Sequence, residues 1–194
     1  MQESDQNAVN KYKLTNNTFR FSTALGLLIA NLMLFTTASA HDWPCGVRGL
    51  HWDRWGTPDI YVYRTTPAGD NSTQAQNAIA EWTADTVLDL FNASSHTDVS
   101  VYDFNYGSGG PGGQTTWPGQ SGCHITHAHA TANSYYVNGY TSLQKRALYC
   151  HELGHAWGLD HMGSIDECLA AGTYVNSHSI TDMDTKYSSS HTTH

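Results

Sequence analysis

The sequence has few charged residues, and basic residues are the scarcer kind. Only 9 Lys and Arg accompany 17 Asp and Glu in 194 residues, so the formal net charge is -8. Without a surplus of basic residues, the composition does not predict a positively charged surface for phosphate backbones or anionic lipid. We therefore exclude nucleic acid as a partner. The hydrophobic share of 39% is enough to build one core and excludes a wholly disordered chain.

Long apolar runs are also missing, apart from one near the N-terminus. It covers residues 24–35 and is followed by the small residues Ala38 and Ala40. A run of this length is too short to span a bilayer comfortably and is typical of a secretory signal peptide. We predict that residues 1–40 are cleaved off. Residues 41–194 would then form one extracellular, monomeric domain that is not attached to the membrane. An uncleaved signal anchor is the alternative.

The four cysteines lack the Cys-x-x-Cys spacing that a zinc site built from cysteines would need. In a short exported chain they are best explained as two disulfides. Cys150 and Cys168 are close in sequence, so we pair them, and Cys45 is left to pair with Cys123. The sequence alone also allows the other two pairings.

Hydrophobic periodicity and turn signals predict the first elements. Alternating β-forming residues indicate strands at 59–64, 98–105 and 124–133. Asp70, Asn71 or Ser72 can cap a helix that is expected over 70–91, with its apolar residues at helical spacing. The glycine-rich segment 107–122 is expected to be a long surface loop. It lacks the glycine spacing of a phosphate-binding loop.

A second long helix begins with a capping box and ends at a glycine. Thr141 and Gln144 have the capping-box spacing, and Gly158 would stop the helix. A short last helix is expected over 181–187.

This second helix contains the motif His151-Glu152-x-x-His155-x-x-Gly158-x-x-His161. Two histidines four residues apart project from one helix face and can bind one ion together. A sharp turn at Gly158 would bring His161 back as a third ligand. Three histidines leave one zinc position open, which distinguishes a catalytic site from a closed structural one. Glu152 can then act as general base on the zinc-activated water.

An amphipathic helix with incidental core histidines is the structural alternative to this metal site. A His-Glu-x-x-His match alone occurs by chance. The added glycine and third histidine at fixed offsets, in an exported chain, favour the metal site.

The motif is the zinc signature of the metzincin metallopeptidases, and the sequence resembles their matrixin-like secreted branch, since Leu159 and Asp160 precede the third histidine. Residues 78–91 resemble the first matrixin helix. Residues 125–133 resemble the edge strand that, in such enzymes, runs beside the cleft and pairs with an extended substrate.

The resemblance implies an α+β fold of the zincin or metzincin type. Such a domain has a twisted mixed β-sheet and two main helices, the second of which carries the zinc motif. It also implies one catalytic zinc held by His151, His155 and His161, with Glu152 as the catalytic residue and a protein or peptide as substrate. Neither a second structural zinc nor a calcium has further support in the sequence.

Two positions depart from the matrixin pattern. The methionine that metzincins place in a turn under the zinc would fall at Leu169, which is similar in volume and apolar. Residues 44–47 faintly resemble the matrixin cysteine switch, for which a disulfide at Cys45 is the alternative.

A second histidine cluster, His124, His127 and His129, lies on the predicted strand 124–133. The strand resembles one that contributes a histidine to a structural zinc in matrixins. Because no carboxylate-bearing loop matches, we interpret the three as surface histidines.

These observations predict a secreted zinc-dependent endopeptidase. A catalytically weak or inactive secreted domain that keeps the fold and binds peptides is the alternative, favoured only by Leu169. An exported zinc-sequestering protein would explain the 12 histidines but not the fixed spacing of Gly158 and His161.

Overall fold

The computed structural model describes residues 43, 45, 49–54, 59–95, 98–161, 168, 175 and 177–187. They belong to one compact unit, Ala38–His194. The signal peptide expected at 1–40 lies outside the described residues, and so does Leu169. Within the described part of the chain, no helix is both long and apolar enough to cross a membrane.

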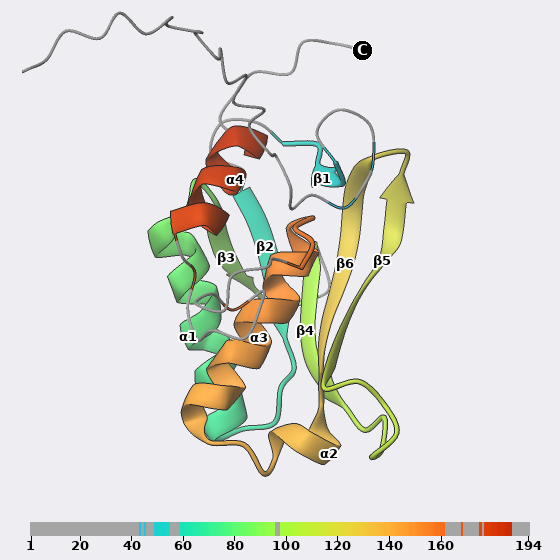
Figure 1. The fold of residues 1–194 in the computed structure, drawn as a ribbon, viewed down its shortest axis with the longest axis vertical. Helices are drawn as coiled ribbons and strands as arrows, with labels where there is room; N and C mark the ends of the chain where they lie inside the picture. Colours follow the sequence, from blue (N-terminus) through green and yellow to red (C-terminus); the bar gives the residue numbers. More distant parts are fainter. Residues whose placement is uncertain are drawn as a thin grey trace, which may run out of the picture. The chain divides into compact units, whose positions relative to one another are not determined.

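A six-stranded mixed sheet forms the centre of this unit (Figure 1). The strand order is β1-β6-β4-β2-β3. β1 and β4 pair with successive parts of one edge of β6, and β5 pairs with its other edge. Among the described strands, β5 and β6 form the only antiparallel pair. The three predicted strands are confirmed, with small changes at the ends of the second. The strands are β1 (His51–Trp52), β2 (Asp59–Arg64), β3 (Asp89–Ala93), β4 (Val99–Phe104), β5 (Gly113–Ser121) and β6 (His124–Asn133).

Two main helices, α1 (Asp70–Asp85) and α3 (Ser142–Ala156), pack against each other over one face of the sheet (Figure 1). The short helix α2 (Ser134–Val137) follows β6, and α4 (Ser177–Tyr187) comes last. The predicted α+β class, a mixed sheet with two main helices of which the second bears the histidine motif, is confirmed.

The core lies between these helices and the sheet. Trp82 of α1 and Leu153 of α3 are fully buried, as are the inward-facing residues Val101 and Ala130 of β4 and β6. The indole Nε1 of Trp82 donates to the carbonyl of Cys150 at 3.1 Å. This bond ties α1 to the turn of α3 on which the histidine motif begins.

Helix α1 is shorter than the sequence predicted. It ends at Asp85 instead of Phe91, and the following residues form β3. Thr86 is extended, and its hydroxyl donates to the carbonyl of Trp82 at 2.6 Å, which closes the helix. β3 then pairs in parallel with β2. The helical periodicity was misleading here because ladder hydrogen bonds to a distant strand outweigh local preference.

The start of α1 differs as well. Gly69 occupies the N-cap position at φ 107°, and no side chain caps the helix. The predicted capping role of Asp70, Asn71 or Ser72 is therefore wrong. The Asp70 carboxylate instead accepts from the hydroxyl of Ser142 at 3.0 Å and pairs with Lys145 at 3.0 Å, which joins the start of α1 to that of α3.

The glycine-rich segment 107–122 is not a loop throughout, because most of it forms β5. The pairing with β6 shifts register between Thr116 and Gly119, around Pro118. Proline has no N–H to donate to a neighbouring strand. It is tolerated here because β6 is the only described neighbour of β5 and because a bulge leaves a residue unpaired. β6 is therefore an inner strand, and the prediction that residues 125–133 form the edge beside the cleft is wrong. That position belongs to β5.

Helix α3 begins and ends where the sequence predicts. Thr141 and Gln144 form the capping box, and the helix closes with Trp157 at its C-cap. Gly158 follows at φ 87°. A Cβ atom at this position would lie 1.9 Å from the carbonyl oxygen of Leu50, so the close approach of two backbones requires glycine. The last helix begins at Ser177, earlier than predicted.

Both predicted disulfides are confirmed. Cys45 bonds to Cys123 and Cys150 to Cys168, with Cα atoms 5.4 Å and 5.7 Å apart. Cys45 therefore has no thiolate for a cysteine switch.

Candidate metal centre

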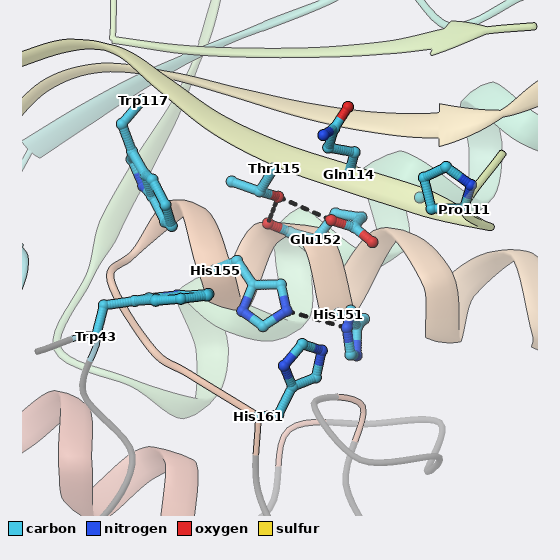
Figure 2. Close-up of a pocket in the computed structure, with 10 residues that line it drawn as sticks. Trp43, Pro111, Gln114, Thr115, Trp117, His151, Glu152, His155 and His161 are labelled. Atoms are coloured by element: carbon cyan, nitrogen blue, oxygen red, sulfur yellow. Dashed lines mark hydrogen bonds between the residues drawn. The ribbon is translucent and has the colours of Figure 1, made fainter. Parts of the chain in front are cut away.

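The three predicted histidines converge on one point (Figure 2). His151 and His155 lie one turn apart on α3, and their Nε2 atoms are 3.0 Å apart. His161 follows the turn at Gly158, and all the ligand atoms of the three lie within 4.8 Å of one another. The chain thus brings a distant imidazole back to the helix face that carries the other two.

The turn after α3 is held by the last helix. The ammonium of Lys186 is buried and donates to the carbonyl oxygens of Leu50 and Gly158, each at 2.9 Å. The hydroxyl of Tyr187 donates to the carbonyl of Trp157 at 2.9 Å. α4 therefore fixes the path of the chain just before it reaches His161.

Two of the histidines are oriented by backbone carbonyls. His151 Nδ1 lies 2.6 Å from the carbonyl oxygen of Cys168, and His155 Nδ1 lies 2.8 Å from that of Leu159. A carbonyl can only accept, so each Nδ1 carries the hydrogen and each Nε2 keeps its lone pair. Burial lowers the pKa of His151 and lowers that of His155 to about 4, so both rings are uncharged at neutral pH.

His161 is the outermost of the three, with 63% of its side chain exposed. Its backbone N–H donates to the Asp160 carboxylate at 2.7 Å, and the same carboxylate oxygen lies 3.5 Å from His161 Nδ1. Asp160 thus stabilises the backbone at the third histidine.

Glu152 lies beside the histidines and is only 4% exposed. The hydroxyl of Thr115 in β5 contacts both the Glu152 carbonyl oxygen, at 2.7 Å, and its carboxylate Oε2, at 2.9 Å. Gly113, also in β5, packs so closely that a Cβ there would lie 2.3 Å from Glu152 Oε1. Burial raises the pKa of Glu152 to about 7, and the Thr115 bond partly offsets this rise.

The donor set fits a zinc ion. Tetrahedral zinc with Zn–N bonds of about 2.0–2.1 Å holds its ligand nitrogens roughly 3.3 Å apart. The observed Nε2 separation of 3.0 Å is close to that value. Neutral imidazoles whose other nitrogen donates to a carbonyl are the ordinary form of a zinc-ligating histidine. Within the described residues, this is the one group of three or more metal-binding side chains close enough to share an ion.

A cleft of about 320 Å³ opens over this cluster. Its lining includes the three histidines, Glu152, and several residues that the sequence analysis did not single out. Those residues are Trp43, Pro111, Gly113, Gln114, Thr115 and Trp117. Most belong to β5 or its approach, so they were missed because segment 107–122 was taken for a loop. No local pattern marks Trp43 as a cleft residue.

The second histidine cluster does not reproduce such a centre. His127 and His129 lie half-buried on the face of β6 opposite the buried alanines, with their Nε2 atoms 3.0 Å apart. The Tyr102 hydroxyl lies 3.3 Å from His129 Nδ1, and His124 lies 3.8 Å from Asp53. Among the described residues no third ligand lies close enough to this pair to share an ion. Their interpretation as surface histidines stays a prediction.

No protein-family model matches the sequence, and no curated protein matches it. Solved structures do. One structure of myroilysin is 16% identical, with a TM-score of 0.42, over 56% of this chain and 52% of that one. High choriolytic enzyme 1, a hatching enzyme zinc-protease from the medaka fish Oryzias latipes, is 14% identical, with a TM-score of 0.39, over 62% and 54%. A crystal structure of myroilysin is 15% identical, with a TM-score of 0.41, over 73% and 67%.

The matched region spans about half the length of the first two of these proteins. The matrixin branch stays a prediction.

Proposed function

We propose that the chain is a secreted zinc-dependent endopeptidase, with zinc held by His151, His155 and His161 and with Glu152 as general base. The supporting observation is the convergence of three imidazoles in a cleft that a buried carboxylate also lines. Structural zinc sites are closed by four protein ligands, whereas catalytic sites use three. Three converge here among the described residues.

A zinc ion bound by the histidines would supply the Lewis acid for hydrolysis, because it polarises a carbonyl and lowers the pKa of water toward ~7. In this proposal Glu152 moves the proton. Its Oε2 lies 2.9 Å from the Thr115 hydroxyl, so we assign to Oε1 the proton that water loses and that the leaving amine nitrogen later receives. His151 and His155 stay in position through their bonds to the Cys168 and Leu159 carbonyls.

An extended peptide is the substrate that the cleft favours. β5 is the strand next to the histidines, and β6 is its only neighbour in the described sheet. Free backbone groups on such an edge can pair with an added strand. Because Gly113 and Thr115 of β5 contact Glu152, a peptide bound along β5 passes the carboxylate.

Secretion is supported by the two disulfides, since such bonds persist in oxidising compartments. Expression of the full chain in a secreting host tests it. N-terminal sequencing of the protein from the medium should begin at His41. Retention of the chain in the cell membrane fraction would instead favour the uncleaved anchor.

Casein digestion by purified protein, together with its zinc content, tests the activity. Glu152→Gln should keep zinc while proteolysis falls by at least ~100-fold, the scale that general-base catalysis supplies. His161→Ala should lose zinc and activity together. Asp85→Asn, which removes one carboxylate from α1 away from the cleft, is the matched control and should digest casein normally.

A Glu152→Gln protein that digests casein at the wild-type rate would overturn the assignment of Glu152 as general base. A wild-type protein that binds zinc and peptides but cuts neither casein nor gelatin would favour the peptide-binding alternative.

A further inference from the structure

Three aromatic rings meet at one end of the cleft. The Trp43 and Trp117 ring centroids are 5.4 Å apart with their planes at 72°, and Trp43 lies 6.0 Å from the His155 ring at 66°. Such edge-to-face contacts are favourable and hold the rings in fixed relative orientations. In Figure 2 the two indoles stand on one side of the histidines, and Pro111 stands on the other. We name this arrangement of Trp43, Trp117 and His155 the aromatic corner.

Backbone hydrogen bonds and a nearby disulfide hold Trp43 in the aromatic corner. Its backbone N–H donates to the Gly158 carbonyl at 3.3 Å, and its carbonyl accepts from Leu50 N–H at 3.0 Å. Two residues further on, Cys45 is bonded to Cys123, between β5 and β6. With both backbone groups hydrogen-bonded and a disulfide two residues away, Trp43 has a fixed position at the side of the cleft.

Trp117 belongs to the strand along which the substrate is proposed to lie. It is two residues after Thr115, so both side chains project from the same face of β5, which is the face toward α3. Two residues of a strand span roughly 6.6 Å. The aromatic corner is therefore about two peptide residues away from the contact between Thr115 and Glu152.

The corner is mostly apolar. Both indoles are partly buried against the hydrophobic core, and both line the cleft. The Nε1 donor of each indole is buried and has no hydrogen-bond partner among the described residues. Among the described residues of the lining, Glu152 is the only acid or base besides the histidines, and it lies toward Gly113 instead of the corner. The described side chains of the corner therefore offer aromatic faces and edges to a ligand, and no acidic or basic side chain other than His155 is among them.

We infer that the aromatic corner is a subsite that selects a bulky apolar side chain of the substrate, preferably an aromatic one, about two residues from the bond that is cut. This inference rests on the proposed peptidase function. An aromatic side chain in the corner gains ring contacts in addition to its burial, while a charged side chain would lose hydration without a partner.

Binding to a protein that cannot turn over its ligand tests the subsite separately from catalysis. The test uses zinc-loaded Glu152→Gln protein and a set of Ala/Gly peptides with a single Phe moved through each position. Anisotropy of a labelled peptide gives Kd. One position should bind about tenfold more tightly with Phe than with Ala. Trp43→Ala and Trp117→Ala should each abolish that preference, and Trp43→Phe should keep most of it.

Phe104→Ala is the matched control, because Phe104 is a 53% exposed aromatic residue of β4 that is not part of the cleft. It should leave the preference unchanged. Circular dichroism and zinc content of each variant establish that the domain is folded. Mass spectrometry of the fragments that wild-type protein makes from the same peptides should place the preferred Phe about two residues from the cut.

The inference is overturned if the Phe preference is absent, or if it persists in both tryptophan variants. It is also overturned if Trp43→Ala binds every peptide more tightly, since Trp43 would then obstruct the cleft. Failure of the peptidase function looks different. In that case wild-type protein cuts no peptide, while the Phe preference and its loss in the tryptophan variants are still measured.

Discussion

Thr115 joins the edge strand to the zinc-motif helix through a single hydroxyl, which lies 2.7 Å from the carbonyl oxygen of Glu152 and 2.9 Å from its carboxylate Oε2. The two residues are 37 positions apart in the chain. The contact places the proposed general base relative to β5, along which we propose that the substrate lies. Thr115 is therefore a positioning residue for Glu152.

Thr115→Val should lower kcat by about 10- to 100-fold, the equivalent of one hydrogen bond to a charged group, with zinc content unchanged. Thr115→Ser keeps the hydroxyl and should restore most of the rate. Thr116→Val, the neighbouring change on the opposite face of β5, is the control. A merely structural role for Thr115 would show as equal losses in the Ser and Val variants.

Gly113 contributes to the same arrangement by having no side chain. In Gly113→Ala the new methyl group would lie 2.3 Å from Glu152 Oε1, so either the carboxylate or β5 must move. We expect a loss of activity with zinc still bound. At Gly112 the nearest atom to an added methyl is the Tyr140 hydroxyl at 4.0 Å, so Gly112→Ala should be tolerated. Equal activities of the two alanine variants would contradict the proposed packing.

The Cys150–Cys168 disulfide closes a short loop, and Cys168 also supplies the carbonyl that orients His151. Replacing both cysteines with Ala should lower the free energy of unfolding by roughly 3 kcal/mol in the chain-entropy model. Urea unfolding of zinc-free protein measures this loss. Zinc affinity should fall as well, because the segment that holds the His151 ring is less constrained. An unchanged zinc affinity would show that the carbonyl stays in place without the bond.

Asp70 gives the domain a pH-dependent stability away from the metal site. Hydrogen bonds from Gln74 and Lys145 lower the pKa of Asp70 below its ordinary value of 3.8. A group whose pKa is lower in the folded state stabilises the fold above the unfolded pKa, and this contribution is lost as pH falls through the folded pKa. The Asp70→Asn protein should therefore have a lower free energy of unfolding than wild type at pH 7, and this difference in free energy should become smaller below pH 3.8.

Urea unfolding across this pH range, with a chelator in every sample, measures the Asp70 effect without contributions from metal loss. Asp85→Asn removes a carboxylate from the other end of α1 and serves as the control. A difference between Asp70→Asn and wild type that stays constant with pH would rule out the titration of Asp70 as its cause.

Elements with a strong local signal could be predicted from the sequence. β6 matches its predicted range because polar and apolar residues alternate along it. α3 matches because Thr141 and Gln144 begin it with a capping box and because Gly158 ends it. Gly158 also made the third histidine predictable, since glycine adopts the positive φ that a sharp turn needs, and the structure has it at φ 87°.

Elements that depend on a partner strand could not be predicted from the sequence. β5 lies in the glycine-rich segment 107–122 and contains Pro118, which hides its strand-forming residues from a sequence-based prediction, and it forms because β6 supplies the hydrogen bonds. The first three residues of β3 continue the helical pattern of α1 and fall within the helix predicted over 70–91. Its conformation is decided by pairing with β2.

The local sequence encodes which candidate metal-binding groups this chain has and how they are spaced. His151, Glu152, His155 and His161 lie on and just after one helix, so helical geometry and the turn at Gly158 bring them near one another. That turn is also held by Lys186 and Tyr187 of a distant helix. What surrounds these groups depends on the tertiary structure. Thr115, Gly113 and Trp43 come from segments far away in sequence, and their approach depends on β-sheet pairing, a disulfide and backbone contacts between distant residues. Local periodicity encodes none of these contacts, because it reflects only the hydrogen bonds and the exposed or buried face of the element in which a residue lies.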